Sequence, residues 1–540
     1  MKTLLLSSLT KVFKDVKPNF NEFTSYSALK GERFSFQVAF MAECKEETEI
    51  FISVSSPLSK YIKLYFVENI PTGRNGYDNS DSLHYDLSRK EFPDLLMPID
   101  GKIKVKKGCW YSIWVELCPQ NEFVGNKKIT VCLSTAACEK KESFKLNIVD
   151  EVLPEQQLLF TNWFHNDCLC TYYGVEAFSE EYWRIVESYI RNAVDHGVTM
   201  LLTPVFTPPL DTEVGGERPT VQLVKITKEK GKYSFDFTNF EKYVALCLDC
   251  GIKAFEISHF FTQWGATSAP KIVATVNGKK KKIFGWDTKA SGKAYTEFLE
   301  AFAKEFKKEV KKLGIKKLCW LHVSDEPSQN QIESYKKAAD ILHRLFPDFN
   351  TLDALSDIEF FKNGLIKTPV CCESEADIFR AEVKNFWTYY CCTQVHDFLP
   401  NRFFSQPSLR NRVLGVLLYK YNAKGFLQWG HNFWYSQYSK YEIDPFKVTD
   451  AGGSFPSGDS FVVYPGKDGT PLNSLRHKVF AEAMQDLRAL QLLESKTNRK
   501  FVIELIEKGL DTPLSFKSYP HQQQWLLDLR KSVNEAIENN

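Results

Sequence analysis

Two carboxylates, Asp325 and Glu326, are adjacent in the sequence and follow the largely apolar segment 318–323 after a single serine, Ser324. An apolar strand that runs into two acids and then a proline, Pro327, is typical of the carboxyl end of a strand in an α/β fold, where catalytic side chains gather. A purely structural interpretation is also available, in which Ser324 or Asp325 caps the next helix and Pro327 is its first residue. The sequence alone leaves both interpretations open.

Adjacent carboxylates suit one particular form of glycoside cleavage. In most glycosidases the acid and the second carboxylate lie on separate strands, about 5 Å apart when configuration is retained. A sugar with a 2-acetamido group brings its own nucleophile, the amide oxygen. The protein then needs an acid/base, here Glu326, and a carboxylate that holds the amide N–H, here Asp325. Coupling between neighbouring acids also favours one of them remaining protonated.

Two other readings of the same residues are possible. One is a conventional two-carboxylate glycosidase that uses Glu326 together with Glu256 or Glu373, both of which lie on or at the end of predicted strands. The other is a carbohydrate-binding protein that has kept its aromatic residues but has no catalytic activity.

Aromatic and polar residues on or after other predicted strands form a second group of candidates. At such positions a side chain either lines a sugar site or packs inside the fold. These candidate substrate contacts are His259, Trp264, Trp429, Asn432 and Trp434. In a further loop, Asp211 and Arg218 either bind sugar hydroxyls or pair with each other, and pairing is the preferred interpretation.

The elements that must position these residues fall into two classes. The first 150 residues show short period-two alternation between turn-rich loops, without a convincing amphipathic helix, which predicts a β-sandwich. The predicted strands are 33–38, 49–54, 62–67, 110–117, 129–133 and 144–148.

From about residue 157 strands alternate with helices. Ser179 predicts one helix start, and Thr238 with Glu241 has the spacing of a capping box at another. Eight strand–helix units over about 330 residues predict a (β/α)8 TIM-like barrel, with a doubly wound open sheet as the alternative. The predicted strands are 158–164, 198–206, 252–258, 317–323, 351–355, 370–372, 386–391 and 425–429.

Composition argues against several classes of partner. A net charge of +2 gives no electrostatic reason to expect nucleic acid or an anionic membrane. No segment has the apolar length of a membrane span, and Leu4–Leu6 is too short for a signal-peptide core. Fourteen cysteines without metal-ligand spacing predict reduced thiols and a cytoplasmic protein. We expect no metal and no organic cofactor.

Several blocks of this sequence resemble glycoside hydrolase family 123, exo-β-N-acetylgalactosaminidases with a β-sandwich before a catalytic barrel. The downstream region also resembles a bacterial domain of unknown function. The resemblance covers roughly residues 155–490. It rests on the Asp325–Glu326 pair and on segments 386–392, 425–434 and 464–466 with 474–476.

The resemblance implies an exo-acting, retaining enzyme that releases terminal GalNAc by substrate-assisted catalysis through an oxazolinium ion. Asp325 and Glu326 take the two roles given above. Tyr389 would donate its hydroxyl to the acetamido oxygen, although Tyr390 is adjacent and only one of the two can point inward. Trp387, in the same block, is a further candidate substrate contact. The implied substrate is a small molecule or oligosaccharide with a terminal β-linked N-acetylhexosamine.

Three domains are therefore expected: an N-terminal β-sandwich over 1–152, the catalytic barrel over 153–495, and a C-terminal helical extension over 496–540 packed on the barrel.

Overall fold

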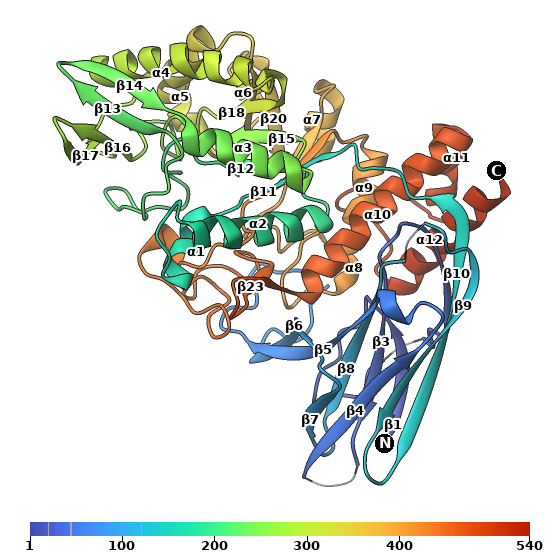
Figure 1. Ribbon diagram of the computed structural model, residues 1–540. Coiled ribbons are helices and arrows are strands. Elements are labelled where there is room, and N and C mark those ends of the chain that lie inside the picture. Colours follow the sequence, from blue (N-terminus) through green and yellow to red (C-terminus); the bar gives the residue numbers. More distant parts are fainter. Residues whose placement is uncertain (20, 44–45, 120) are drawn as a thin grey trace.

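The N-terminal part of the chain folds into two five-stranded sheets packed as a β-sandwich, in a computed structural model that describes residues 1–19, 21–43, 46–119 and 121–540 (Figure 1). One sheet has the order β1 (Lys2–Ser7), β3 (Phe34–Met41), β8 (Trp110–Leu117), β5 (Ile62–Pro71), β6 (Glu91–Pro98). The other has the order β2 (Ser25–Lys30), β10 (Glu139–Val152), β9 (Gly125–Ser134), β4 (Glu47–Ser55), β7 (Lys102–Lys106). The predicted β-sandwich is confirmed.

Four of these strands, β1, β2, β6 and β7, escaped the sequence-based prediction. The run Leu4–Leu6 belongs to β1, where Leu5 is buried in the main core and Leu6 in a separate cluster with Val12, Ala39 and Trp110. Only β2 and β10 pair in parallel, and all other described pairings in the sandwich are antiparallel.

The second half of the chain forms the predicted barrel, and all eight predicted strands are present as one closed parallel sheet. Strand order around the barrel follows chain order, which excludes the doubly wound alternative. The barrel strands are β11 (Leu159–Asn162), β12 (Met200–Thr203), β15 (Ala254–Ile257), β18 (Cys319–Leu321), β19 (Asn350–Leu355), β20 (Thr368–Cys372), β21 (Trp387–Tyr389) and β22 (Gly425–Gln428).

Helices surround this sheet. The residues at which α2 and α3 begin test the helix caps predicted from the sequence. Ser179 accepts a hydrogen bond from the Tyr182 backbone N–H and caps α2, as predicted. The capping box at Thr238 was wrong, because Thr238 is already helical and its hydroxyl donates to Asp236 at 2.6 Å. The barrel helices are α1 (Asn166–Tyr173), α2 (Glu180–Asp195), α3 (Thr238–Cys250), α4 (Lys293–Lys312), α5 (Ile332–Leu345), α6 (Glu359–Lys362), α7 (Ala376–Glu382), α8 (Ser408–Arg412), α9 (Leu414–Lys420) and α10 (Leu475–Lys496).

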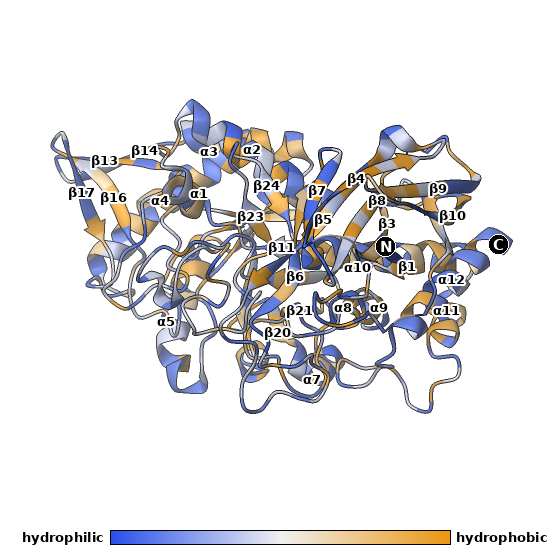
Figure 2. Cartoon of the chain, turned by 90° about the horizontal axis from the view of Figure 1, so that it is seen from below, coloured by the Kyte–Doolittle hydropathy of each residue, from blue (hydrophilic) through white to orange (hydrophobic). Residues whose placement is uncertain are grey.

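Two long loops at the carboxyl ends of β12 and β15 fold onto each other. They form a separate sheet of order β14 (Lys232–Asp236), β13 (Lys225–Glu229), β16 (Ile272–Val276), β17 (Lys279–Phe284). Figure 2 shows β17, which begins with the lysine run, as hydrophilic beside a hydrophobic β16. A shorter pair, β23 (Val463–Pro465) and β24 (Pro471–Asn473), follows β22.

Helix α10 joins the two halves of the molecule and is buried on nearly every side (Figure 1). Its buried charged residues, Arg476, Lys478, Glu482 and Asp486, are therefore paired. Arg476 meets Asp94 of β6 at 2.8 Å and 3.0 Å, and the Tyr464 hydroxyl donates to the same carboxylate at 2.6 Å. After α11 (Arg499–Ile506), α12 (Gln523–Asn539) packs on α10 and on strands β2 and β10. Among the described helices, none combines the length and apolarity needed to cross a bilayer.

The Arg476–Asp94 pair gives a stability prediction. Asp94→Ala leaves a fully buried guanidinium without its carboxylate, and we expect the free energy of unfolding to fall by about 3–5 kcal/mol. The matched control is Asp348→Ala, which breaks an exposed pair with Lys316 at 3.5 Å and should cost less than about 1 kcal/mol. Denaturant unfolding followed by tryptophan fluorescence measures both, and equal midpoints for the two variants would contradict the prediction.

Candidate active site

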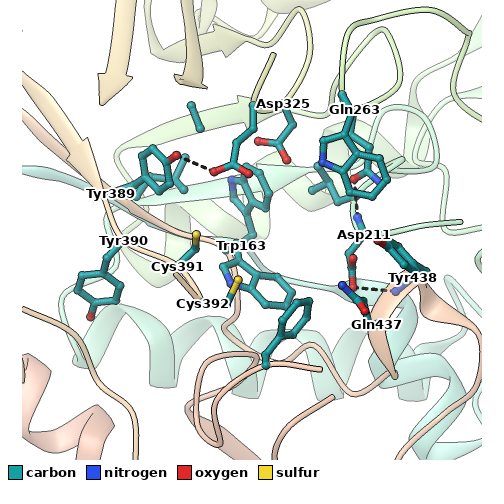
Figure 3. A pocket seen from close by; sticks show the side chains of 17 residues that line it. Trp163, Asp211, Gln263, Asp325, Tyr389, Tyr390, Cys391, Cys392, Gln437 and Tyr438 are labelled. Carbon is teal, nitrogen blue, oxygen red and sulfur yellow. Dashed lines mark hydrogen bonds between the residues drawn. The ribbon is translucent and has the colours of Figure 1, made fainter. Parts of the chain in front are cut away.

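A cavity of about 220 Å³ opens at the carboxyl ends of the barrel strands (Figure 3). Its wall is built by residues on β19, β21 and β22 and by residues in the loops after β11, β12, β15, β18, β21 and β22, so residues from nearly all round the barrel converge on one place. This is the end of the barrel at which loops carry function in this architecture. Asp325 and Glu326, which follow β18, both line the cavity.

The two carboxylates have different surroundings. Glu326 Oε1 accepts a hydrogen bond from the Tyr389 hydroxyl at 2.6 Å, drawn as a dashed line in Figure 3. The Asp325 carboxylate accepts no hydrogen bond from any described residue, although it lies in the cavity wall. Asp325 is therefore free to bind a donor from a ligand.

The environment favours a proton on this pair. Burial, and then the adjacent Glu326 charge, raise the pKa of Asp325 well above its usual value. Burial also raises the pKa of Glu326, against the opposing effect of the Tyr389 hydrogen bond, although solvent reaches Glu326 at the cavity mouth. Because two anions this close repel each other, the pair titrates as a unit and retains one proton toward neutral pH.

A buried charge network lies beneath the pair. His322 Nε2 is 2.5 Å from Glu256 Oε1, its Nδ1 is 2.8 Å from Asp353 Oδ1, and all three side chains are fully buried. Burial opposes a charge on the imidazole, but these two hydrogen bonds raise the pKa of His322 to about 9. Both ring nitrogens then donate, so one imidazolium lies between two carboxyl groups beneath Asp325 and Glu326.

Asp353 also holds the backbone that leads to the pair. Its carboxylate accepts the N–H groups of Val323 at 3.1 Å and Ser324 at 3.3 Å, and the Glu326 N–H donates to the Ala354 carbonyl at 3.1 Å. The Tyr335 hydroxyl, from the following helix α5, donates to Asp353 at 2.5 Å. Strand β19 thus fixes the course of the Asp325–Glu326 segment.

Four residues of the cavity wall adopt left-handed backbone conformations that side chains other than glycine rarely take. They are Asp211 (φ 39°), Trp264 (φ 57°), Glu326 (φ 40°) and Tyr438 (φ 62°). Hydrogen bonds lock them together: the Trp264 N–H donates to the Asp325 carbonyl at 3.0 Å, and the Tyr438 N–H donates to Asp211 Oδ2 at 3.1 Å. Such strain persists only where surrounding contacts dictate it, and it gathers at functional sites.

Strand alternation decides between the two neighbouring tyrosines. Tyr389 belongs to the core inside the barrel and points its hydroxyl at Glu326, whereas Tyr390 points away and packs on Phe426 between the sheet and the helices. Tyr389 is therefore the one that reaches the cavity with its side chain.

Of the other residues predicted to contact the substrate, some line the cavity and some do not. Trp264 and Trp429 line the cavity, and the Trp429 indole N–H donates to Asp459 at 3.0 Å. His259 does not: it lies beneath the wall, stacked on His322 with ring centres 4.0 Å apart.

Three others are also excluded from the cavity wall. Trp387 is buried inside the barrel against Trp320, Asn432 is bonded to the backbone of His165, and the Trp434 indole donates to the Val463 carbonyl at 3.3 Å. Asn432 and Trp434 were candidates because they follow a barrel strand, and Trp387 because it belongs to a block that carries the family resemblance, but tight packing uses all three structurally.

Some cavity residues were missed by sequence reasoning. Asp211 lines the cavity instead of pairing with Arg218, which binds Asp167 at 2.7 Å and 2.8 Å. Burial raises the pKa of Asp211 to about 6. Trp163 could have been predicted from the sequence as a cavity residue, because a tryptophan one residue after β11 must face either the mouth or the core of the barrel. The other missed wall residues include Gln263, Cys391, Cys392, Gln437, Tyr438 and Phe455.

Neither alternative carboxylate reaches the cavity. Glu256 is fully buried and accepts hydrogen bonds from Trp163 at 2.7 Å, from Thr161 and from His322. Glu373 is 1% exposed and its carboxylate lies outside the cavity wall, where burial raises its pKa.

One cluster has the composition of a metal site. Ligand atoms of His259, His322 and Asp353 lie within 4.8 Å of one another. Both nitrogens of His322 are already bonded to carboxylates, and Asp353 accepts bonds from Tyr335 and the backbone. Only His259 keeps unused nitrogens, so the donor set does not fit an ion.

The network predicts a specific protonation state. At pH 7 we expect His322 to be a doubly protonated imidazolium, since its pKa is about 9, and His259 to be neutral, because burial and the His322 charge lower its pKa. Nitrogen-15 spectra of histidine-labelled protein measure both, with signals assigned by His322→Gln and His259→Gln variants. A neutral His322 ring at pH 7 would overturn this account of the charge beneath the pair.

Comparison with known proteins agrees with this geometry. The family profile described as glycoside hydrolase 123, catalytic domain, matches residues 163–493. A solved family 123 glycoside hydrolase from Clostridium perfringens, studied for glycolipid glycan hydrolysis, has a TM-score of 0.75 at 16% identity, covering 100% of this chain and 97% of that one. It therefore shares the whole two-part fold. A search of curated proteins found no match.

More distant structures share less. β-Glucuronidase 3 from Bacteroides uniformis has a TM-score of 0.31 at 11% identity, covering 85% of this chain and 50% of that one. An endo-β-1,4-mannanase from Thermotoga petrophila has a TM-score of 0.32 at 13% identity, with coverages of 62% and 77%. The profile match spans more than half of the sequence, and the chain is therefore a member of glycoside hydrolase family 123, an enzyme that acts on carbohydrate.

Proposed function

We propose that the enzyme is an exo-acting, retaining β-N-acetylgalactosaminidase that uses the substrate's 2-acetamido group as its nucleophile. One observation carries the proposal: Asp325 and Glu326 are adjacent in the cavity wall, Glu326 is bonded to Tyr389, and Asp325 has an unused carboxylate. A third carboxylate, Asp211, lies at the opposite end of the cavity (Figure 3). This arrangement suits an acid and an amide-orienting group more than a pair of acids flanking the scissile bond.

In the first step the amide oxygen attacks the anomeric carbon and the bond from that carbon to the leaving oxygen breaks. When the amide N–H binds Asp325 and Tyr389 turns away from Glu326, the Asp325 anion is stabilised and the proton of the pair passes to Glu326, which gives it to the leaving oxygen. The Asp325 carboxylate accepts the amide N–H and stabilises the positive charge that develops on the oxazolinium ring. Tyr389 moves its hydroxyl from Glu326 to the amide oxygen, which holds that oxygen under the anomeric carbon.

In the second step water attacks the anomeric carbon from the side that the leaving group vacated. Glu326, now a carboxylate, takes the proton from water, and the ring C–O bond of the intermediate breaks to restore the acetamido group. Two inversions at one carbon give net retention.

The shape of the cavity supports exo action on one sugar. Trp163, Trp264 and Trp429 provide flat apolar faces, and the Asp211 end is walled by Gln437 and Tyr438. In this pose Asp211 meets hydroxyls on the side of the ring opposite the anomeric carbon, where GalNAc and GlcNAc differ at C4. The family resemblance and the work on glycolipid glycans with the Clostridium perfringens enzyme favour GalNAc on a glycan as the substrate.

The conventional mechanism has less support. Glu256 is committed to His322, Trp163 and Thr161, and Glu373 lies outside the cavity wall, so neither has access to an anomeric carbon.

The division of roles predicts a chemical rescue pattern. With 4-nitrophenyl β-GalNAc we expect Glu326→Gln and Asp325→Asn each to lower kcat by about 10²–10⁴-fold. A 2,4-dinitrophenyl leaving group departs without a proton, so it should restore most of kcat/KM, which reports the first step, in Glu326→Gln and little of it in Asp325→Asn. The kcat of Glu326→Gln should stay low, because the attacking water still lacks its base. Steady-state kinetics measure this, and rescue of Asp325→Asn alone would reverse the assignment. The plain 4-nitrophenyl β-galactoside is the control and should not be cleaved.

Tyr389 gives a pH prediction. Its hydrogen bond stabilises the Glu326 anion and lowers the pKa of that group, so removing it raises the pKa. The alkaline limb of kcat/KM reports loss of the proton from the acid in the free enzyme. Tyr389→Phe should therefore move that limb to higher pH while lowering kcat, because the acetamido oxygen loses its partner. A limb that moves to lower pH would contradict the assignment.

A further inference from the structure

The loop between β5 and β6, residues 72–90, leaves the sandwich and packs on the barrel. We call it the sandwich arm. It lies outside residues 163–493, the part of the chain that the family profile matches. The arm bonds to two barrel loops, 390–407 after β21 and 429–462 after β22. Both loops supply residues to the wall of the catalytic cavity, so the arm contacts the loops that shape it.

One end of the arm holds the segment 450–457 of the second loop through Arg74. The Arg74 N–H donates to Asp450 Oδ2 at 2.8 Å, and its Nε donates to the Gly453 carbonyl at 2.8 Å. The Ser457 N–H donates to the Arg74 carbonyl at 2.7 Å. Both ends of this short segment are therefore tied to a single residue of the arm.

A glycine in the arm allows this close approach. A Cβ on Gly73 would lie 2.1 Å from Asp450 Oδ2, which is far inside van der Waals contact. The buried Asp450 carboxylate is also held in place, because its Oδ1 accepts the Gly453 N–H at 2.9 Å while its Oδ2 accepts the Arg74 N–H. The fit between the arm and the loop thus leaves no room for a side chain at residue 73.

One residue of the held segment faces the substrate. Phe455 lines the cavity, and its ring packs edge-on against Trp429 with ring centres 5.5 Å apart. The Tyr77 hydroxyl of the arm donates to the carbonyl of Ser454, the preceding residue, at 3.2 Å. The Asp450 carbonyl accepts the Phe455 N–H at 3.0 Å. The arm therefore sets where Phe455 lies beside Trp429.

The middle of the arm is fixed on the other barrel loop. The Asp81 N–H donates to the Val395 carbonyl at 3.0 Å, and Asp81 Oδ2 accepts the Phe398 N–H at 2.8 Å. The same carboxylate pairs with the buried guanidinium of Arg410, in α8, at 2.9 Å and 3.1 Å. Because the arm is anchored here, its end near Arg74 is a rigid support for the segment 450–457.

We propose that the sandwich arm is a positioning element of the substrate cavity, which holds Phe455 against Trp429 and so shapes the aromatic wall on which the terminal sugar packs. The sandwich is then part of the functional site, and the barrel alone is an incomplete one. The inference rests on the proposed function, because the terminal sugar is the ligand of that wall. An aromatic face packs on the sugar in the bound substrate and in the transition state alike, so the arm acts on KM more than on kcat.

Gly73→Ala tests the arm without changing a residue of the cavity wall. The added Cβ forces the Asp450 carboxylate away from the N–H groups of Arg74 and Gly453. With 4-nitrophenyl β-GalNAc we expect KM to rise about tenfold while kcat changes by less than about twofold. Tyr77→Phe is a milder variant that removes only the bond to the Ser454 carbonyl, and it should raise KM about threefold.

A double-mutant cycle shows whether the arm acts through Phe455. Phe455→Ala alone should raise KM about tenfold, and adding Gly73→Ala to it should change KM little further. A general loss of structure would instead give independent effects that multiply to about a hundredfold. Multiplied effects, an unchanged KM in Phe455→Ala, or an unchanged KM in both Gly73→Ala and Tyr77→Phe overturns the proposal.

The matched control on the same arm is Asp86→Ala. Its exposed carboxylate accepts the Ser88 N–H at 2.9 Å, within the arm, and bonds to no described residue of the barrel, so KM should stay unchanged. A rise equal to that of Gly73→Ala would also contradict the proposal. If the intact enzyme leaves 4-nitrophenyl β-GalNAc uncleaved, the proposed function fails and the inference falls with it. If the substrate is cleaved and KM does not respond, the inference alone fails.

Discussion

The carboxylate of Asp353 is the constraint on which the site depends. It binds the N–H groups of Val323 and Ser324, the ring of His322 and the hydroxyl of Tyr335 in one buried place. These bonds fix the end of β18 against β19, and they force Glu326 into a left-handed backbone that an unsupported chain would leave. The direction in which the two catalytic candidates point is therefore set by a residue that does not touch the cavity.

Burial sets the electrostatics of the site more than the network does. It is the largest influence on the pKa of both Asp325 and Glu326, and it raises both. The charge of Glu326 raises the pKa of Asp325 further, whereas the imidazolium of His322 opposes that rise. In a region of low dielectric constant a doubly ionised pair is unfavourable, so the pair retains one proton toward neutral pH. Glu256 is held by its hydrogen bonds to His322 and Trp163, so it is unable to act as a nucleophile. This fits a reaction in which the sugar itself supplies the nucleophile.

Sequence reasoning found the barrel strands but not which of their side chains meet inside the barrel. Each barrel strand has a run of apolar residues, so all eight could be predicted, and the Asp325–Glu326 pair was visible because its residues are adjacent. The Glu256–His322–Asp353 network was not visible, since its members are distant in the sequence and meet only through the register of β15, β18 and β19. His259 and Trp434 failed as contacts for a related reason: a position just after a strand does not say whether a side chain faces the cavity or the packing beneath it.

The central claim is that the substrate's amide oxygen is the nucleophile, and a series of substrates tests it most directly. Replacing one, two or three hydrogens of the N-acetyl methyl group by fluorine withdraws electrons from the amide oxygen. The size of the methyl group changes little. For 4-nitrophenyl glycosides of this series the account predicts a steep, monotonic fall in kcat/KM with each fluorine. A rate that stays level across the series would contradict it and would require a nucleophile from the protein.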